Sequence, residues 1–179
     1  MPTVNVMKRS TATADFKPRE LTALAVFAAL MVALQVAMAG LPNIEPVTLL
    51  TILCALHLGK KAFLSIGAFV LVEGLIYGFH IWWINYLYVW PLLILIVLIL
   101  RRWSHPILWA VVAGIYGLLF GTLCSIPYFI AGGWGAGLGY IVGGIPFDIT
   151  HSIGNILMTL LLFYPLDRVL RRVLSKNVN

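Results

Sequence analysis

The sequence predicts an all-α membrane protein, a six-transmembrane-helix bundle with both termini in the cytoplasm. Hydrophobic residues make up 61% of the 179-residue chain and charged residues only 10%, and mean hydropathy is +1.00. Several apolar runs approach the roughly 20 helical residues that cross a hydrocarbon core of about 30 Å. A water-soluble domain of this size does not hide so much apolar surface.

Hydropathy and helix-breaking residues place the six helices at about 20–40, 46–58, 62–79, 84–100, 107–130 and 146–168. The first apolar run has no small-residue cleavage signature, so it is expected to be a retained helix rather than a signal peptide. The second helix is short, and a helix that is tilted, broken or joined to a partly inserted loop is expected there. We divide the chain into a cytoplasmic N-terminal segment (1–18), a transmembrane domain (19–172) and a cytoplasmic tail (173–179).

The basic residues set the expected orientation. With six helices, all 12 Lys and Arg residues fall on one side of the membrane, and removing one interior helix would move later clusters to the wrong side. The positive-inside rule then places both termini in the cytoplasm. The net charge of +6 therefore reflects topology and not a nucleic-acid surface. The basic residues are Lys8, Arg9, Lys17, Arg19, Lys60, Lys61, Arg101, Arg102, Arg168, Arg171, Arg172 and Lys176.

Sequence motifs for catalysis are missing. The chain contains no Walker A loop, HExxH, GxSxG or paired CxxC motif, so we expect no catalytic residues, no metal site and no ATPase activity of its own. Cys54 and Cys124 both lie in apolar runs, where a thiol usually behaves as a small hydrophobe.

Small residues form a ladder on the first helix. Ala25, Ala29, Ala33 and Ala37 are spaced four residues apart, which places them in one row where another helix can approach closely. Two interpretations stay open, packing inside the protein's own bundle or docking of a separate membrane subunit.

A proline-bracketed loop, LPNIEPVTLL at 41–50, follows this helix. Pro42 and Pro46 restrict the chain between them, so the segment from Asn43 to Glu45 is expected to be extended. The loop is either a rigid connector or a segment that contacts a ligand.

Glu73 lies inside the third helix, where an unpaired carboxylate is costly. It therefore belongs either to an internal polar network or to a ligand or proton site. His151 and Asn155 are candidate hydrogen-bond donors to it.

Aromatic residues gather at the predicted external end, in HIWWINYLYVW at 80–90 and around a glycine-rich stretch at 131–144 that is expected to be a loop. Interfacial aromatic belts are common in membrane proteins, but this density also suits a pocket for a flat or bulky organic ligand.

The stretch GIPFDITHSIGN at 144–155 places Asp148, His151, Ser152 and Asn155 on one helix face. Pro146 suits the first turn of a helix, so Asp148 is expected to cap that helix. One His and one Asp are too few for a typical zinc site, and no nucleophile elbow accompanies a Ser/His/Asp triad. The expected role is an internal polar seam.

Together the six short helices, the alanine ladder, PNIEPVTLL and GIPFDITHSIGN resemble the substrate-binding S component of an energy-coupling factor (ECF) transporter, over about residues 18–172. The resemblance implies a multi-pass plasma-membrane protein that captures a vitamin outside and delivers it inward. A T subunit docked on Ala25, Ala29 and Ala33 and two cytoplasmic ATPases would supply the power. ATP would be used by these partners, and the chain would need no cofactor of its own and bind no nucleic acid.

The candidate site residues fall into two groups. The candidate ligand-binding residues are Asn43, Glu45, His80, Trp82, Trp83, Asn85, Tyr86, Tyr128, Trp134, Tyr140, Asp148 and His151. Glu73 and Asn155 are assigned to the internal polar network.

Substrate identity rests on the resemblance alone. The sequence is most similar to cobalamin-type S components of lactic acid bacteria, and its weakly charged external loops suit a bulky, largely neutral ligand. Pantothenate, hydroxymethylpyrimidine and queuosine are alternatives, and the lack of an external Arg or Lys disfavours the carboxylates among them. A proton-coupled carrier using Glu73 or Asp148, and an intramembrane enzyme using Asp148, His151 and Glu73, are the competing classes.

Overall fold

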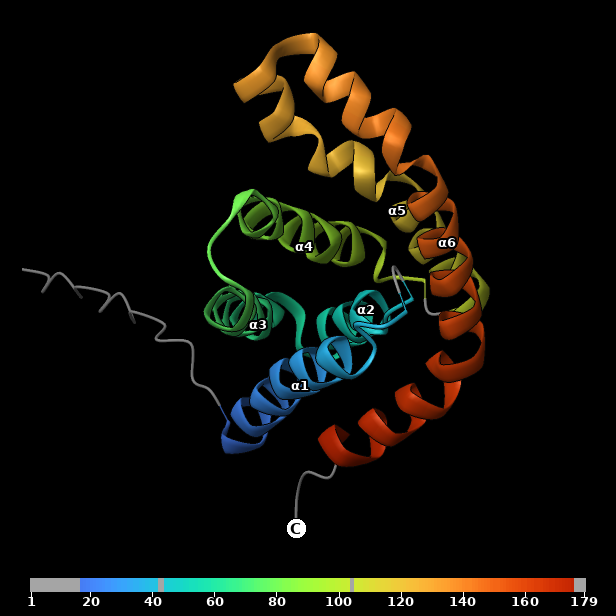
Figure 1. Ribbon diagram of the computed structural model, residues 1–179. Coiled ribbons are helices and arrows are strands. Elements are labelled where there is room, and N and C mark those ends of the chain that lie inside the picture. The colour runs from blue at the N-terminus through green and yellow to red at the C-terminus, as the bar shows by residue number, and fades with distance from the viewer. Residues whose placement is uncertain (1–16, 42–43, 104, 176–179) are drawn as a thin grey trace, which may run out of the picture.

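The chain folds as an all-α protein whose computed structural model describes residues 17–41, 44–103 and 105–175. Figure 1 shows its helices packed side by side. They are α1 (Pro18–Ala37), α2 (Val47–Leu58), the short 3₁₀ helix η1 (Gly59–Lys61), α3 (Ala62–Tyr77), α4 (Ile81–Leu100), α5 (Pro106–Cys124) and α6 (Ile126–Ser175).

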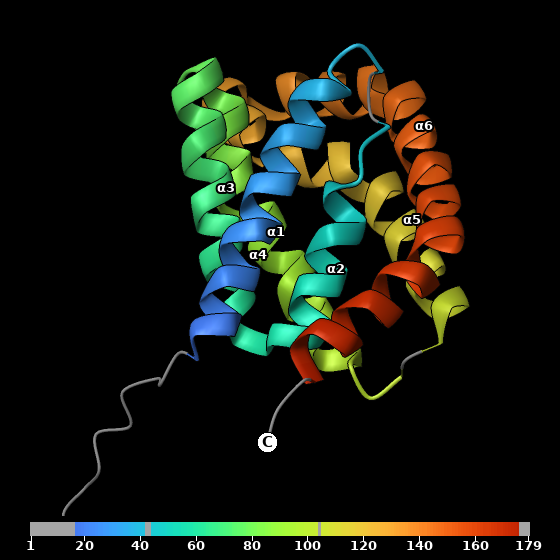
Figure 2. The ribbon, with the colours of Figure 1, turned by 90° about the horizontal axis from the view of Figure 1, so that it is seen from below.

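Five stretches are long and apolar enough to cross a membrane: Pro18–Ala37, Val47–Tyr77, Ile81–Leu100, Pro106–Cys124 and Ile126–Leu174. The protein is therefore a multi-span helical membrane protein. The second stretch contains both α2 and α3, which meet at η1 and run in opposite directions (Figure 2). A sixth crossing and the cytoplasmic location of the termini stay predictions.

Both ends of the described chain lie at the same end of the bundle, called here the terminal end (Figure 2). η1 and the link between α4 and α5 lie there too. Three ion pairs hold this end together: Lys61 Nζ to Glu20 Oε2 at 2.6 Å, His57 Nε2 to Asp167 Oδ1 at 2.9 Å, and Arg171 Nε to Asp167 Oδ2 at 2.8 Å. The opposite end, called the far end, carries the α1–α2 and α3–α4 connections.

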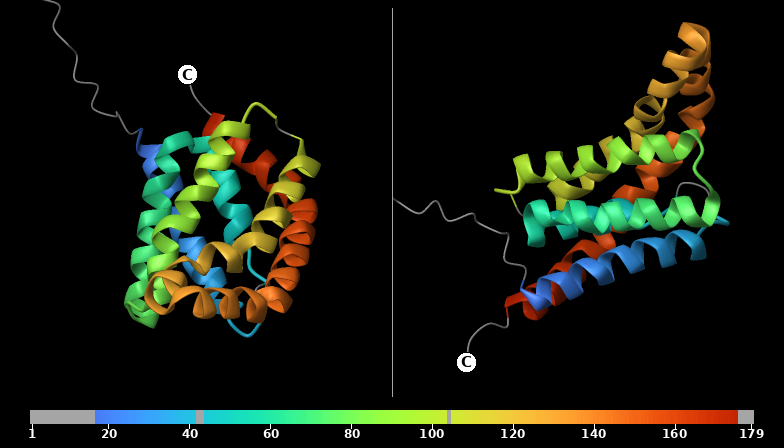
Figure 3. Two further views of the ribbon diagram at one scale, coloured as in Figure 1. Left: turned by 90° about the horizontal axis from the view of Figure 1, so that it is seen from above. Right: turned by 90° about the vertical axis from the view of Figure 1, so that its left-hand side faces the viewer.

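The glycine-rich stretch 131–144 is helical, and its prediction as a loop is wrong. α6 begins at Ile126, and only Gly133 departs from helical geometry, with φ 70° and ψ −168°. Glycine tolerates this positive φ, so the chain reverses there and forms a helical arm, residues 126–147, that stands out from the bundle (Figures 1 and 3). The sequence predicted that one helix ends at 130 and that the next begins at 146. In the structure α5 ends at Cys124 and α6 begins at Ile126.

α2 is the central helix of the bundle. Every residue from Val47 to Ala55 is buried, and Figure 2 shows α2 surrounded by its neighbours. A helix that is apolar on all sides is stable only when other helices cover it. It spans only the 12 residues between the loop after α1 and the turn at Gly59.

The outer faces of the other helices are apolar. Large hydrophobic side chains there are half exposed or more, for example Leu75 at 68%, Ile99 at 76% and Leu161 at 70%. An apolar surface of this extent on a multi-span helical protein is the surface that contacts lipid.

Candidate functional site

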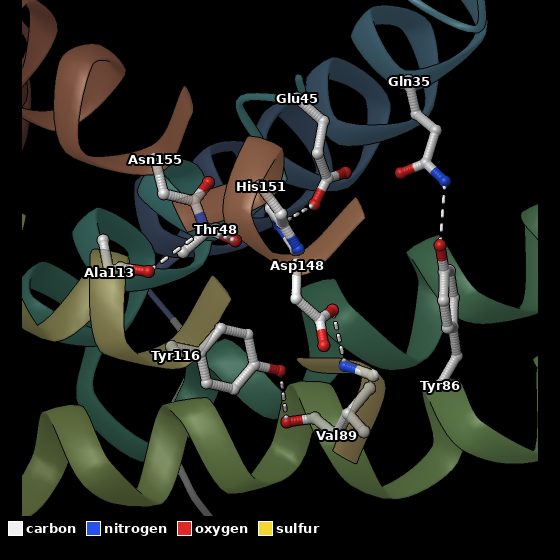
Figure 4. A network of polar contacts seen from close by, with 11 residues as sticks. Gln35, Glu45, Thr48, Tyr86, Val89, Ala113, Tyr116, Asp148, His151 and Asn155 are labelled. Carbon is white, nitrogen blue, oxygen red and sulfur yellow. Dashed lines mark hydrogen bonds and ion pairs between the residues drawn. The ribbon is translucent and has the colours of Figure 1, made fainter. Parts of the chain in front are cut away.

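The polar stripe of α6 faces the interior of the bundle, as the helical spacing predicted. Asp148, His151 and Asn155 are 7%, 3% and 2% exposed. Thr159, one turn further, is fully buried and extends the same face. Figure 4 shows the stripe directed toward α2, α5 and the loop that contains Glu45.

Asn155 ties three helices together. Its Nδ2 donates to Thr48 Oγ1 of α2 at 3.3 Å and to the Ala113 carbonyl of α5 at 3.1 Å (Figure 4). Both contacts are buried, where water does not compete for them. The assignment of Asn155 to an internal polar network agrees with these bonds.

Asp148 does not cap a helix, and this prediction is wrong because α6 begins 22 residues earlier, at Ile126. Pro146 likewise lies inside the helix. The Asp148 carboxylate instead accepts a hydrogen bond from the Gly121 backbone N–H of α5, with Oδ1 at 2.9 Å. Asp148 therefore fixes α6 against α5.

His151 approaches the proline-bracketed loop. Its Nε2 lies 3.5 Å from Glu45 Oε1, an ion-pair distance (Figure 4). Yet neither ring nitrogen has a hydrogen-bond partner among the residues that the structure describes. Its ring packs edge-on against Phe120 with centroids 4.9 Å apart. Ile44 and Glu45 lie outside the helices, as predicted, whereas the predicted ligand residue Asn43 lies outside the described residues.

Two hollows open at the far end of the bundle. The first, about 130 Å³, is lined by Gln35, Met38, Ala39, Leu41, Ile44, Glu45, Tyr86, Phe120 and His151. The second, about 360 Å³, is lined by Gln35, Ala39, Glu73, Tyr77, Trp82 and Tyr86. Gln35 Nε2 donates to the Tyr86 hydroxyl at 3.0 Å, and both residues line both hollows. This hydrogen bond therefore forms the wall between them.

Glu73 lines the second hollow and is 1% exposed. Its Oε1 has no hydrogen-bond partner within the described ranges. The expectation that His151 or Asn155 donates to it is wrong, because the nitrogen atoms of these residues approach Glu45, Thr48 and Ala113 instead.

The ligand-binding residues predicted around the aromatic segments divide into three sets. Trp82 and Tyr86 line the hollows. Trp83 and Asn85 are structural, since Trp83 Nε1 donates to the Val70 carbonyl at 2.9 Å and Asn85 Oδ1 accepts from the Tyr88 hydroxyl at 2.9 Å. The others lie away from the hollows: His80 and Trp134 are exposed, and Tyr128 and Tyr140 stack on each other within the helical arm, 4.1 Å apart.

A row of glycines on α5 was missed by sequence reasoning. Gly114, Gly117 and Gly121 face α6, and a Cβ at Gly117 would lie 2.9 Å from the Ser152 backbone nitrogen. A Cβ at Gly121 would lie 2.5 Å from Asp148 Oδ2. The close approach that these glycines permit is what brings the polar stripe against α5. Their spacing in GIYGLLFG was the signal that could have revealed them.

The alanine ladder lies on the outside of the bundle. Ala25, Ala29, Ala33 and Ala37 are all exposed, so packing inside the protein's own bundle does not explain their spacing. The buried face of α1 is formed by Leu24, Phe27, Ala28 and Met31.

A larger apolar groove of about 530 Å³ lies between α1, α2 and α6 near the terminal end. Leu30, Leu53 and Leu166 are typical of its lining, to which Arg19 and Thr22 also contribute. It offers few polar groups to orient a specific ligand. We therefore place the candidate site in the two hollows of the far end and not in this groove.

Within residues 17–41, 44–103 and 105–175 no three His, Cys, Asp or Glu side chains gather in a geometry that holds a metal ion. Cys54 and Cys124 are buried free thiols. Cys54 donates weakly to Ser65 Oγ, which in turn donates to the Leu24 carbonyl.

The bond between Asn155 and Thr48 is expected to contribute to stability. In a double-mutant cycle of Asn155→Ala and Thr48→Val, the coupling energy should be about 0.6 kcal/mol, typical of buried hydrogen bonds between membrane helices. The measurement is the unfolding free energy in mixed detergent micelles. Thr22→Val removes an exposed hydroxyl that bonds within its own helix and serves as the control. If the effects of the two substitutions on the free energy of unfolding simply add, the prediction is contradicted.

No protein-family profile matches the chain, and neither a curated protein nor a solved structure matches it.

Proposed function

We propose that this chain is the substrate-binding S component of an ECF-type transporter and that its two hollows hold a small organic micronutrient. One observation carries the proposal: buried polar atoms of His151, Glu73 and Gln35 that have no hydrogen-bond partner among the described residues converge on hollows walled by aromatic residues. Leaving such groups unpaired costs about 1–3 kcal/mol each. A bound ligand would supply the missing partners.

The proposal places the hollows toward the outside and both termini in the cytoplasm of a plasma-membrane protein. Support comes from the charges, because every Lys and Arg of the described chain belongs to an element end at the terminal end of the bundle. The far end lacks them, as the positive-inside rule expects of an external surface.

The proposal also gives the chain partners. A T subunit would bind the exposed alanine ladder of α1, and two cytoplasmic ATPases would hydrolyse ATP, so the chain acts as a transporter subunit and not as an enzyme. The hollow of about 360 Å³ is in the range of pockets for compact ligands, about 300–1,000 Å³. It supports hydroxymethylpyrimidine or queuosine better than a corrinoid such as cobalamin, and the carboxylates at the site oppose pantothenate.

A proton-coupled carrier is the second candidate, favoured by the buried Glu73 carboxylate. Intramembrane carboxylates often mark proton pathways. This carrier would accumulate substrate in vesicles without ATP, driven by a proton gradient. The enzyme hypothesis has less support, because Glu73 and His151 line different hollows and Asp148 is held against α5.

The test is to identify the small molecule that co-purifies with the full chain. The protein is expressed in rich medium with and without the other subunits, and mass spectrometry of the denatured extract should find one enriched organic compound. Uptake of that compound should require ATP and the partner subunits. Uptake driven by a proton gradient alone would favour the carrier, and an extract without any enriched compound would contradict a binding role.

A further inference from the structure

Among the described residues that line the two hollows, two are carboxylates and none is a lysine or arginine. Glu45 lines the first hollow and Glu73 the second. No lysine or arginine in the part of the chain that the structure describes lines either hollow. Negative charge inside a membrane protein is costly unless a partner neutralises it. A ligand that brings positive charge would supply such a partner.

Unpartnered atoms point to the same chemistry. Gln35 Oε1 and Glu73 Oε1 are buried acceptors with no donor among the described residues. Glu45 has a carboxylate oxygen near His151, but at 3.5 Å the contact is long. A ligand with several N–H donors would satisfy these oxygens.

The walls are flat and aromatic. Tyr86 stands between the hollows and is bordered by Trp82 at 5.2 Å, Phe69 at 6.0 Å and Trp90 at 5.5 Å between ring centroids. Tyr77 packs edge-on against Trp82 and lines the second hollow. Aromatic faces attract cations and give a planar ring a surface on which to stack.

The volumes of the two hollows limit the size of the ligand. The hollow with Glu73 has about 360 Å³, and the hollow with Glu45 and His151 about 130 Å³. The Gln35–Tyr86 hydrogen bond separates them. A compact ring fits the larger hollow, and a short donor-bearing substituent fits the smaller one once this bond yields.

We propose that the ligand is a compact, flat organic cation, an amine- or amidine-bearing ring, whose N–H groups bind Glu73 and Glu45 while its ring packs against the aromatic wall that Tyr86 and Trp82 form together. This rests on the proposed function, which makes the two hollows a substrate site. It adds the charge and shape of the substrate.

The test uses three probes of nearly equal shape and different charge: benzamidine, benzamide and benzoate. Each is titrated against the purified full chain in detergent, and tryptophan fluorescence reports binding. Benzamidine is expected to bind at least about tenfold more tightly than benzamide, and benzoate more weakly still. Equal binding of all three, or tighter binding of benzoate, would overturn the proposed ligand class but leave the site standing.

Substitutions of single carboxylates test whether the preference for benzamidine arises at the two hollows. Glu73→Gln should remove most of the preference for benzamidine over benzamide while the melting temperature stays near that of the parent protein. Glu20→Gln changes a carboxylate at the terminal end in the same way and should leave the preference intact. A preference unchanged by Glu73→Gln and by Glu45→Gln would place the cation elsewhere and overturn the proposal. If none of the probes binds at millimolar concentration, the proposed ligand class is overturned, whereas the proposed function is decided separately by the compound that co-purifies with the chain.

Discussion

Replacing Gly117 with leucine is expected to abolish recovery of folded protein, and even Gly117→Ala should lower the free energy of unfolding by about 1–3 kcal/mol. A Cβ at this position would lie 2.9 Å from the Ser152 backbone nitrogen and 3.0 Å from the His151 carbonyl carbon. These are backbone atoms of α6 and cannot rotate away as a flexible side chain can. The two helices must therefore move apart.

Separation of α5 from α6 would reach the candidate site. Asn155 Nδ2 would lose its bond to the Ala113 carbonyl, and Asp148 its bond to Gly121. His151 lies on the same face of α6, so its position beside Glu45 would change as well. We therefore expect Gly117→Ala to weaken ligand binding in addition to its effect on stability.

The measurement is unfolding in mixed detergent micelles, followed by circular dichroism. Gly67→Ala is the matched control, because Gly67 is a helical glycine of α3 with nothing within 4 Å of its Cβ. That substitution should be neutral or stabilise by up to about 1 kcal/mol, since alanine favours helix more than glycine does. A Gly117→Ala variant as stable as Gly67→Ala would contradict the close packing of α5 on α6.

Periodicity and hydropathy predicted most of the fold. The ends of α1, α3 and α4 agree with their predicted ranges to within three residues, because apolar length and flanking polar residues determine where such helices end. The arm could not be predicted in the same way. Glycine suggests a loop in water, but within a membrane protein the backbone must satisfy its own hydrogen bonds, so 131–144 is helical and only Gly133 breaks the geometry.

The site was predicted in part. The shared burial of Asp148, His151 and Asn155 followed from helical spacing, which sequence reports directly. The role of Gln35 could not be predicted from helical spacing, because its hydrogen-bond partner Tyr86 lies 51 residues away and no local sequence pattern links the two residues. The sequence also did not show which aromatic residues line a hollow. A rotation of α4 about its axis by one residue would direct Trp83 toward the hollow instead of Trp82.

Replacing Ala29 with tryptophan is expected to abolish ATP-dependent uptake while leaving ligand binding by the isolated chain unchanged. Ala29 is exposed in the middle of the ladder formed with Ala25 and Ala33, and it lines neither hollow. An indole there would keep a second helix from approaching α1, and close approach is the source of attraction at small-residue faces. The substitution thus separates docking of the T subunit from capture of the ligand.

Two further variants make the Ala29 result specific. Ile115→Trp adds the same bulk on α5, at a side chain that is 55% exposed, and should leave uptake near that of the parent. Ala29→Gly keeps the face small and should retain uptake as well. Uptake by reconstituted vesicles and co-purification of the T subunit are measured together for all variants. If Ala29→Trp lowers ligand binding and uptake equally, the ladder supports the fold of this chain and not a partner, because a docking surface alone does not affect a site at the far end.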